Sequence, residues 1–483
     1  MIADFKPYST YKDSGVPWLG EVPEHWEVQR LKYVLRERDT RSADGREQLL
    51  SVSQYTGVTQ RTRVGGVGEP DTRAESLIGY KCVEPKDLVV NIMLAWNGSM
   101  GASHFHGIAS PAYCVYRFGP NTEPWYFHHL LRSPAYKARI KAVSTGVVES
   151  RLRLYTDDIY RLEALFPPVP EQAAIVRFLD YADRRIRRYI HAKQKLIKLL
   201  EEQKQAIIHR AVTRGLNPNV RLKPSGVEWL GDVPEHWTLA RLKDAAVVQS
   251  GLTLGKSYKG VKTASRPYLR VANVQVGRVD LKHVKYLDIP IKEANGATLR
   301  AGDVLMTEGG DIDKLGRGCV WRDEIPRCLH QNHIFAVRCR KDVLNPEFLV
   351  GLMASQHGRA YFQLTAKQTT NLASTNSSTL RAFPILLPPL AEQQTILEEI
   401  AKQTAGPIAA IGRAEREIEL LREYRTRLIA DVVTGKFDVR KAAAKLPDET
   451  GESEPLDDVE VLMEGDEDVE NESLDAVPDE AEA

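Results

Sequence analysis

Residues 14–32 read SGVPWLGEVPEHWEVQRLK and residues 225–243 read SGVEWLGDVPEHWTLARLK, which gives 14 identities in 19 positions at an offset of 211. An internal repeat this close indicates a chain built from two copies of one plan, and it determines how the rest of the sequence is divided. Trp18, Trp26, Trp229 and Trp237 recur within the repeat. We therefore expect all four tryptophans to belong to the structural core.

Two further matches follow at a different offset. PPVPEQAAI from Pro167 matches PPLAEQQTI from Pro388, and LLEEQKQAIIHRAVT from Leu199 matches LLREYRTRLIADVVT from Leu420, both at an offset of 221. The second copy thus has ten extra residues, all between its PEHW segment and its PPxxEQ segment. Each copy is predicted to be a variable globular domain followed by a segment of fixed length.

The segments of fixed length are predicted to be long amphipathic helices. Alternating steps of 4 and 3 residues from Ile175 give a seam with eight apolar positions in eleven, opened by Pro170 and Glu171 and closed near Gly215. The seam runs through Ile175, Leu179, Ala182, Ile186, Tyr189, Lys193, Leu196, Leu200, Gln203, Ile207 and Arg210.

The same steps from Ile396 give seven apolar positions in eleven, with Gly406 and Pro407 inside, where we expect a kink or a restart. Two stripes of matched length predict an antiparallel helical pair, each helix spanning roughly 66 Å. The alternative is that each helix packs only on its own domain.

The variable regions are rich in predicted strands, and shorter helices follow near PWYFHHLLRS from Pro124 and NPEFLVGLMAS from Asn345. The strand candidates are KDLVVNIML from Lys86, AYCVYRF from Ala112, PYLRVANVQV from Pro267, GDVLMT from Gly302 and HIFAVRC from His333. The predicted fold class is α+β, with two similar globular domains separated by a pair of long antiparallel helices in pseudo-two-fold fashion. The predicted boundaries are 1–165 and 217–387 for the globular domains, 166–216 and 388–437 for the helical regions, and 438–483 for an acidic, disordered tail.

The net charge of +1 conceals a strong asymmetry. Residues 448–483 hold 17 of the 65 acidic residues and none of the 66 basic ones, so residues 1–447 carry 66 − 48 = +18. A basic excess of this size is typical of a phosphate-binding surface. The acidic tail is predicted to be disordered, serving as a solubilising segment or as a DNA mimic that competes for the basic surface.

The composition also limits the class of protein. No apolar run is long enough to span a membrane, and the N-terminus lacks the pattern of a signal peptide, so a soluble, cytoplasmic protein is expected. The cysteines are odd in number and scattered, which favours reduced thiols over disulfides. They are Cys82, Cys114, Cys319, Cys328 and Cys339. Cys328 and Cys339 with His330 and His333 do not match the spacing of a zinc finger.

The repeated SGVxWLGxVPEHW and PPxxEQ motifs resemble those of the specificity subunits of type I restriction-modification systems, over residues 8 to about 437. The resemblance implies two target recognition domains that each read half of a bipartite DNA site. It also implies docking of modification (methyltransferase) subunits on the helical regions and of restriction (translocase and nuclease) subunits through the assembled complex. S-adenosylmethionine, ATP and Mg would then be bound by the partners and none by this chain. The acidic tail departs from the family pattern.

Two similar but diverged domains would read different half-sites, and a rigid helical pair would fix the gap between them. A self-sufficient nuclease and a scaffold without DNA binding are the alternatives.

Motifs for catalysis are weak. SGLTLGKS from Ser250 encloses three residues between Gly251 and Gly255, whereas a phosphate-binding Walker loop has four. GGVG from Gly65 lacks a third glycine, NPEF at Asn345 is interpreted as a turn that opens a helix, and His25 and His236 are interpreted as structural. A carboxylate cluster around Asp303, Glu308, Asp311, Asp313 and Lys314 has no counterpart in the first copy. No catalytic, cofactor-binding or metal-binding residue is therefore predicted.

Candidate DNA contacts follow from the side chains that read base edges or bind phosphates. In the first domain they are Arg61, Arg63, Arg73, Trp96, Asn97, Ser99, Arg151 and Arg153, and in the second they are Lys256, Tyr258, Lys314, Arg317, Gln331, Asn332, Gln368, Thr369 and Asn371. The alternative for each residue is an ordinary solvated loop.

Overall fold

The computed structural model describes residues 6–61, 74, 76–148, 151–253, 258, 260–310, 312, 315–316, 318–368 and 373–447. The chain divides into two compact units, unit 1 (Met1–Ala192 and Glu417–Ala483) and unit 2 (Lys193–Arg416). No helix in these described ranges is both long and apolar enough to cross a membrane.

Unit 1 is built on a four-stranded antiparallel sheet of order β4-β11-β8-β9. Its strands are β4 (Leu35–Glu37), β11 (Tyr113–Phe118), β8 (Leu88–Asn91) and β9 (Met100–Ala102). Every residue of β8 is buried because both faces of the sheet are covered. Leu88 and Val90 belong to the main core with α1 (Pro124–Leu131) and α2 (Pro134–Val143), whereas Val89 belongs to a second cluster on the opposite face.

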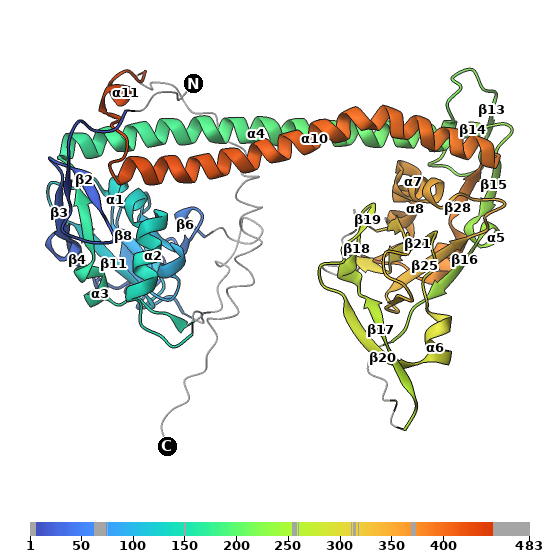
Figure 1. Ribbon diagram of the computed structural model, residues 1–483, viewed down its shortest axis with the longest axis horizontal. Helices are drawn as coiled ribbons and strands as arrows, with labels where there is room; N and C mark the ends of the chain where they lie inside the picture. The colour runs from blue at the N-terminus through green and yellow to red at the C-terminus, as the bar shows by residue number, and fades with distance from the viewer. Residues whose placement is uncertain are drawn as a thin grey trace. The chain divides into compact units, whose positions relative to one another are not determined.

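The remaining elements of unit 1 form short hairpins and connections around this sheet (Figure 1). They are β1 (Tyr11–Asp13), β2 (Glu21–Pro23), β3 (Glu27–Arg30), η1 (Leu31–Tyr33), β5 (Leu50–Ser53), β6 (Gly57–Gln60), β7 (Lys81–Val83), η2 (Ala95–Asn97), β10 (Gly107–Ala109), α3 (Thr156–Arg161) and β12 (Glu163–Phe166). β3 pairs with β12, so the two ends of the globular part lie side by side.

Unit 2 repeats this plan with a four-stranded antiparallel sheet of order β16-β25-β21-β23. Its strands are β16 (Ala246–Ser250), β25 (Ile334–Cys339), β21 (Asp303–Thr307) and β23 (Gly318–Val320). α7 (Pro346–Ala354) and α8 (Gln356–Thr365) take the places of α1 and α2, and β15 (Thr238–Arg241) pairs with β28 (Pro384–Leu387) as β3 pairs with β12.

Unit 2 also has strands without a counterpart in unit 1, among them the long β17–β20 pair. Its other elements are β13 (Leu222–Pro224), β14 (Asp232–Pro234), α5 (Leu242–Ala245), β17 (Thr263–Leu269), η4 (Val271–Asn273), β18 (Val274–Gln275), β19 (Arg278–Val279), β20 (Lys285–Pro290), α6 (Ile291–Gly296), β22 (Gly309–Gly310), β24 (Leu329–His330), β26 (Lys367–Gln368), β27 (Ala373–Ser374) and α9 (Ser377–Ala382). The predicted strand at 267–276 is therefore interrupted, because residues 271–273 form the single turn η4.

The two long helices are α4 (Val169–Arg214) and α10 (Leu390–Val433), which pack together, as predicted. In unit 1, Asp183 of α4 pairs with Arg425 of α10. Arg177, which precedes Asp183 in the sequence, contacts Leu446, which follows Arg425. The two segments therefore run antiparallel. In unit 2, Gly215 at the end of α4 lies beside Glu392 at the start of α10. Gly215 has a φ of +70°, which accounts for the predicted helix end. A short helix, α11 (Arg440–Ala444), follows α10.

The predicted seam of α4 is correct only in its first half. Ile175, Leu179, Ala182 and Ile186 are buried, but the next buried position is Ile190. Tyr189 is 53% exposed and Leu196 is 42% exposed, so the second half of the predicted register is wrong. A straight helix of 3.6 residues per turn drifts away from a strict seven-residue repeat, and the buried face has moved by one residue after Ile186.

The predicted restart of α10 does not occur. The helix continues through Gly406 and Pro407 as one element. A proline removes a single backbone hydrogen bond from a long helix. Burial of Ile411, Ala414 and Ile418 on the following turns holds the helical path.

The four repeated tryptophans do not share one environment. Trp26 and Trp237 are fully buried, as predicted, and Trp18 is partly buried against Tyr136 at a ring distance of 4.9 Å. Trp229 is 41% exposed and donates a hydrogen bond of 3.2 Å to His357, so its prediction as a core residue is wrong.

All five cysteines, which lie within the described ranges, are free thiols. Cys319, Cys328 and Cys339 are buried, and burial raises the pKa of each to about 12. These three thiols are therefore protonated at neutral pH and pack as small apolar side chains.

Candidate nucleic-acid interface

The repeated VPEHW and PPxxEQ motifs meet in space in both units. In unit 1, Glu171 in the first turn of α4 accepts hydrogen bonds from the indole of Trp26 (3.0 Å) and the hydroxyl of Tyr8 (2.6 Å) and pairs with the imidazole of His25 (2.7 Å). Glu171 is only 5% exposed, and a buried carboxylate needs such partners. His25 is thus a structural residue.

The tryptophan and histidine contacts recur in unit 2, whereas Glu171 has two further partners, the hydroxyl of Tyr8 and the guanidinium of Arg440 at 3.9 Å. Glu392 accepts from the indole of Trp237 (3.1 Å) and pairs with His236 (2.8 Å), and its side chain is 31% exposed. Nothing in the described part of unit 2 takes the place of Tyr8 beside Glu392. We call each set the tryptophan–glutamate lock.

The glutamine that follows each glutamate ties the long helix to the globular part. Gln172 accepts from the backbone N–H of Glu123 (2.8 Å), which is the N-cap of α1. Gln393 accepts from the backbone N–H of Asn345 (2.8 Å), the N-cap of α7, which confirms that NPEF opens a helix. In each unit, one Glu-Gln pair therefore fixes the orientation of the globular part on its long helix.

In unit 1, the predicted residues Trp96, Asn97, Arg151 and Arg153 gather around the β8–β9 loop. This loop is bonded to the segment after α2 through Leu154 N–H and Ile92 C=O (2.9 Å). Arg151 and Arg153 are exposed on a hairpin in which Thr145 pairs with Arg153. We call Trp96, Asn97, Arg151 and Arg153, with the lysines described next, the basic loop surface.

Two lysines of α2 that the sequence analysis missed belong to this surface. Lys141 lies over the ring of Trp96 at 5.2 Å, and the stem of Lys137 lies against Gly98. Burial, together with the charge of Arg132, lowers the pKa of Lys137. The spacing of four residues between the two lysines on a helix that begins at Pro134 is the signal that could have found them.

The other predicted residues of unit 1 are placed differently. Ser99 is 2% exposed and its hydroxyl donates to Asn97 (2.8 Å), so it faces the interior and not a ligand. Arg61 follows β6 and pairs through its backbone with Leu49. Arg63 and Arg73 lie outside the described residues.

In unit 2, Gln368 lies on the hairpin β26–β27, the counterpart of the Arg151–Arg153 hairpin. That hairpin pairs with β22 of the β21–β23 loop, and Thr375 N–H donates to Glu308 C=O (2.8 Å). The loop and the hairpin are thus joined at the position that Leu154 and Ile92 occupy in unit 1. Several predicted contacts on this loop, this hairpin and the Gly-rich turn lie outside the described residues, namely Lys256, Lys314, Arg317, Thr369 and Asn371, as do Asp311 and Asp313 of the carboxylate cluster.

Gln331 and Asn332 form a second neighbourhood in unit 2. Asn332 N–H donates to Leu252 C=O (3.0 Å), and the side chain of Gln331 accepts from Val271 N–H (3.4 Å). Tyr258 packs with Leu252 in the adjoining apolar cluster. These contacts place Leu252 beside Gln331 and Asn332.

A pocket of about 350 Å³ in unit 1 holds most of its buried imidazoles. His104 stacks on Trp125 at 3.6 Å, His128 accepts from Ala102 N–H (3.2 Å), and burial lowers the pKa of His129 to about 4. Neighbouring Arg132 donates to the carbonyls of Gln54 (2.8 Å) and Tyr55 (2.7 Å). The imidazoles are therefore neutral at pH 7, and the groups of this pocket hold the β5–β6 turn in place.

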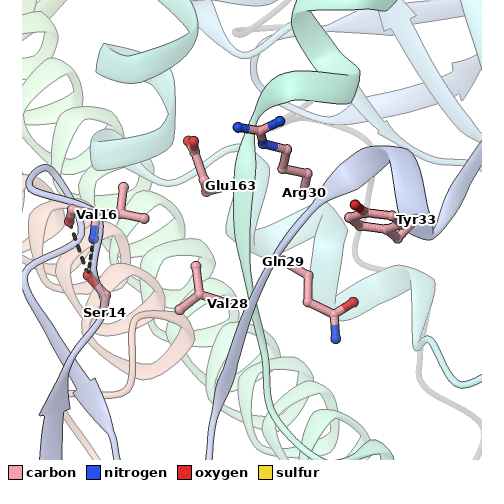
Figure 2. Close-up of a pocket in the computed structure, with 7 residues that line it drawn as sticks. All are labelled: Ser14, Val16, Val28, Gln29, Arg30, Tyr33 and Glu163. Carbon is pink, nitrogen blue, oxygen red and sulfur yellow. Dashed lines mark hydrogen bonds between the residues drawn. The ribbon is translucent and has the colours of Figure 1, made fainter.

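An open pocket of about 560 Å³ in unit 1 lies beside the β3–β12 pair (Figure 2). It is lined by Ser14, Val16, Val28, Gln29, Arg30, Tyr33 and Glu163. Glu163 lies opposite Arg30 across the strand pair, but its counterpart opposite Arg241 is Pro384. The acidic group is thus not part of the repeat. No group of three or more His, Cys, Asp or Glu suited to a metal ion occurs among the described residues.

Comparisons with known proteins give one consistent result, although no family model matches the chain. The chain is 22% identical over 398 residues to the type I restriction enzyme EcoKI specificity subunit of Escherichia coli, covering 77% of this chain and 82% of that protein. It is 22% identical over 439 residues to the type I restriction enzyme MjaVIII specificity subunit of Methanocaldococcus jannaschii, covering 87% of this chain and 94% of that protein.

A similar fold occurs in a solved chain described under complex assembly and conformational transition of the type I R-M system. That chain superposes with a TM-score of 0.60 at 17% identity, over 86% of this chain and 99% of that one. The chain is thus similar over most of its length to type I restriction-modification specificity subunits, and it shares the fold of a chain of the type I R-M system.

Proposed function

We propose that this chain is the DNA-reading subunit of a type I restriction-modification complex and that each unit reads one half of an asymmetric bipartite site. The observation that carries the proposal is that one scaffold occurs twice with different surface chemistry. The helices α2 and α8 begin after Ser133 and Ser355, an offset of 222, so Lys137 corresponds to Arg359 and the cation Lys141 is replaced by the amide Gln363. Two similar scaffolds that carry different side chains at corresponding positions favour recognition of two different half-sites.

The charge of the body supports nucleic acid as the ligand. Residues 1–447 carry a formal charge of +18, and the basic loop surface of unit 1 places Lys141, Arg151 and Arg153 in exposed positions. Cations on adjoining loops are the groups that neutralise backbone phosphates, while Asn97, Gln331, Asn332 and Gln368 supply amides that pair with adenine edges.

Modification subunits would dock on the helical pair, and restriction subunits would join through the assembled complex. Large apolar side chains are exposed on the long helices of unit 1, where they do not stabilise the isolated subunit and could contact a partner. They are Tyr189, Leu420 and Tyr424. The chemistry would belong to these partners, with S-adenosylmethionine, ATP and Mg bound by them and none by this chain. The complex would act in the cytoplasm, where its DNA substrate lies.

The test is methylome mapping of cells that carry this chain with its modification partner, compared with cells that carry the partner alone. We expect one split, asymmetric motif that is methylated only when this chain is present. A palindromic motif, or methylation independent of this chain, would refute the reading role. Incubation of the purified chain with Mg and target DNA separates the alternatives, because cleavage would indicate a self-sufficient nuclease and absence of any sequence preference would indicate a scaffold.

A further inference from the structure

A row of arginines follows one face of the first half of α4. At 100° per residue, Arg177, Arg184 and Arg188 fall within about 40° of one another around the helix axis, and they extend along roughly 16 Å of it. Arg177 and Arg188 are exposed and Arg184 is half-buried. We call Arg177, Arg184, Arg185 and Arg188 the cationic stripe.

The stripe keeps an excess of positive charge. Arg185 is held over its own helix by the hydroxyls of Tyr181 (3.3 Å) and Tyr189 (3.4 Å), which are neutral groups. Asp183 is engaged elsewhere by Arg187 and Arg425. Asp180 and Glu123 line one pocket with Arg177 and Arg184. Four arginines against these two acids leave a charge of about +2 on the stripe.

The chain end is fixed beside this stripe. Arg440 of α11 forms a two-point ion pair with Asp438 (2.9 and 2.7 Å) and lies over the ring of Tyr8 at 5.2 Å. The guanidinium of Arg177 donates to the carbonyls of Leu446 (2.9 Å) and Pro447 (3.4 Å). Figure 1 shows α11 at the N-terminal end of α4 in unit 1. The first member of the stripe therefore already binds the residue before the acidic tail.

The tail has the complementary chemistry. Residues 448–483 contain 17 acidic and no basic residues, and seven of the acids fall in residues 448–460. These seven are Asp448, Glu449, Glu452, Glu454, Asp457, Asp458 and Glu460. Thirteen residues in an extended conformation span at most about 45 Å, so the segment has enough length to follow the whole stripe from Pro447.

We propose that the acidic tail binds in cis to the cationic stripe of α4. Exposed ion pairs are individually weak, but a tethered segment is present at a millimolar effective concentration, so several weak pairs suffice. The attraction is electrostatic at an exposed surface and is therefore screened by salt. The proposal does not depend on the DNA-reading role, since it involves only α4, α11 and the tail.

The test uses the full chain and digestion with a glutamate-specific protease, and the rate at which the tail is cleaved between Glu452 and Glu470 is followed by mass spectrometry. A free peptide of residues 448–483 corrects for the effect of salt on the protease. At about 50 mM salt we expect the tail of the full chain to be cut about 5- to 10-fold more slowly than the peptide, and at about 500 mM salt the two rates should converge.

The double variant Arg184→Glu/Arg188→Glu should remove the protection at low salt. The matched control is Arg117→Glu, which reverses an exposed arginine of β11 in the same unit and should keep the protection. Thermal melts check that the variants fold. Reversal of tail charge in Asp457→Lys/Asp458→Lys/Glu460→Lys, combined with the arginine double variant, should restore protection if the contact is the proposed one.

Two outcomes overturn the proposal. Equal cleavage of chain and peptide at low salt means that the tail has no site on the body. Protection that survives Arg184→Glu/Arg188→Glu but disappears in Arg151→Glu/Arg153→Glu means that the tail instead covers the basic loop surface as a competitor of DNA.

Discussion

The indole Nε1 of Trp26 donates a hydrogen bond of 3.0 Å to the carboxylate of Glu171, which joins the N-terminal repeat motif to the first turn of α4. The same bond, 3.1 Å long, joins Trp237 to Glu392 at the start of α10. Each lock lies where the globular part of a unit meets its long helix. The surface that would read DNA is therefore oriented by the helix that begins at the lock.

The two locks should differ in their contribution to stability. Glu171→Ala leaves the buried donors of Tyr8 and Trp26 without an acceptor and should cost about 2–3 kcal/mol of unfolding free energy. Glu392→Ala should cost about 1 kcal/mol, because Glu392 is more exposed and lacks the two further partners of Glu171, Tyr8 and Arg440. Calorimetric unfolding of both variants measures the difference, and equal losses would show that these two partners have no energetic role.

Stability should fall in mild acid because of the buried imidazoles of unit 1. Burial lowers the pKa of His129 to about 4, so the unfolded chain, with an ordinary histidine pKa near 6.5, binds the proton first as the pH falls. Stability is therefore lost between about pH 6.5 and pH 4, on the order of 1–3 kcal/mol.

The variant His129→Gln should flatten this pH dependence in urea titrations at a series of pH values. His106, which is 61% exposed and pairs with Glu84 at the surface, provides the control variant His106→Gln. If both variants keep the wild-type slope, other groups must cause the acid loss.

Alanine substitution of two glycines in the helical region should change stability in opposite directions. Gly406 lies inside α10, and a methyl group added there meets no atom within 4 Å, so Gly406→Ala should stabilise the chain by about 0.5–1 kcal/mol. Gly435 has a φ of +79°, and its added methyl would meet Pro23 and Trp26, so Gly435→Ala should lower the melting temperature. A destabilising Gly406→Ala would mean that the helix needs the freedom of glycine beside Pro407.

Removal of a cation from the basic loop surface should weaken DNA binding without changing the preferred sequence. If Arg153 contacts a phosphate, Arg153→Ala lowers the slope of log K against log salt by about 1 and affects all sequences alike. Titrations of the target and of unrelated DNA at several salt concentrations test this, with Arg117→Ala as the matched variant. Loss of discrimination at one base would instead indicate that Arg153 reads a base edge.

The repeat made the architecture accessible from sequence alone. Two repeated motif pairs and a fixed offset of 221 predict two helices of similar length, and the glycine after α4 marks its end. The second half of the seam was missed because heptad counting ignores the drift of a straight helix, which exposes Tyr189 and buries Ile190. The environment of Trp229 could not be predicted either, since its hydrogen-bond partner His357 is distant in sequence.

The candidate site was only partly accessible. Residues on the β8–β9 loop and the following hairpin were selected by chemical type, and the structure brings Trp96, Asn97, Arg151 and Arg153 together. Sequence type alone did not separate buried Ser99 from exposed neighbours, because its burial follows from the turn that Asn97 closes. The role of Glu171 and Glu392 was also missed, although both lie in the repeated PPxxEQ motif, because their partners are about 150 residues away in sequence.

If the two units read DNA independently, exchange of one unit should change only its own half-site. The most direct measurement is methylome mapping of cells in which residues 31–162, between β3 and β12, are replaced by the corresponding segment of a relative with a different target. The locks and both long helices are retained in this exchange. We predict that one half of the methylated motif changes, while the other half and the gap between them stay the same. A change in both halves, or in the gap, would show that the two units do not read DNA independently.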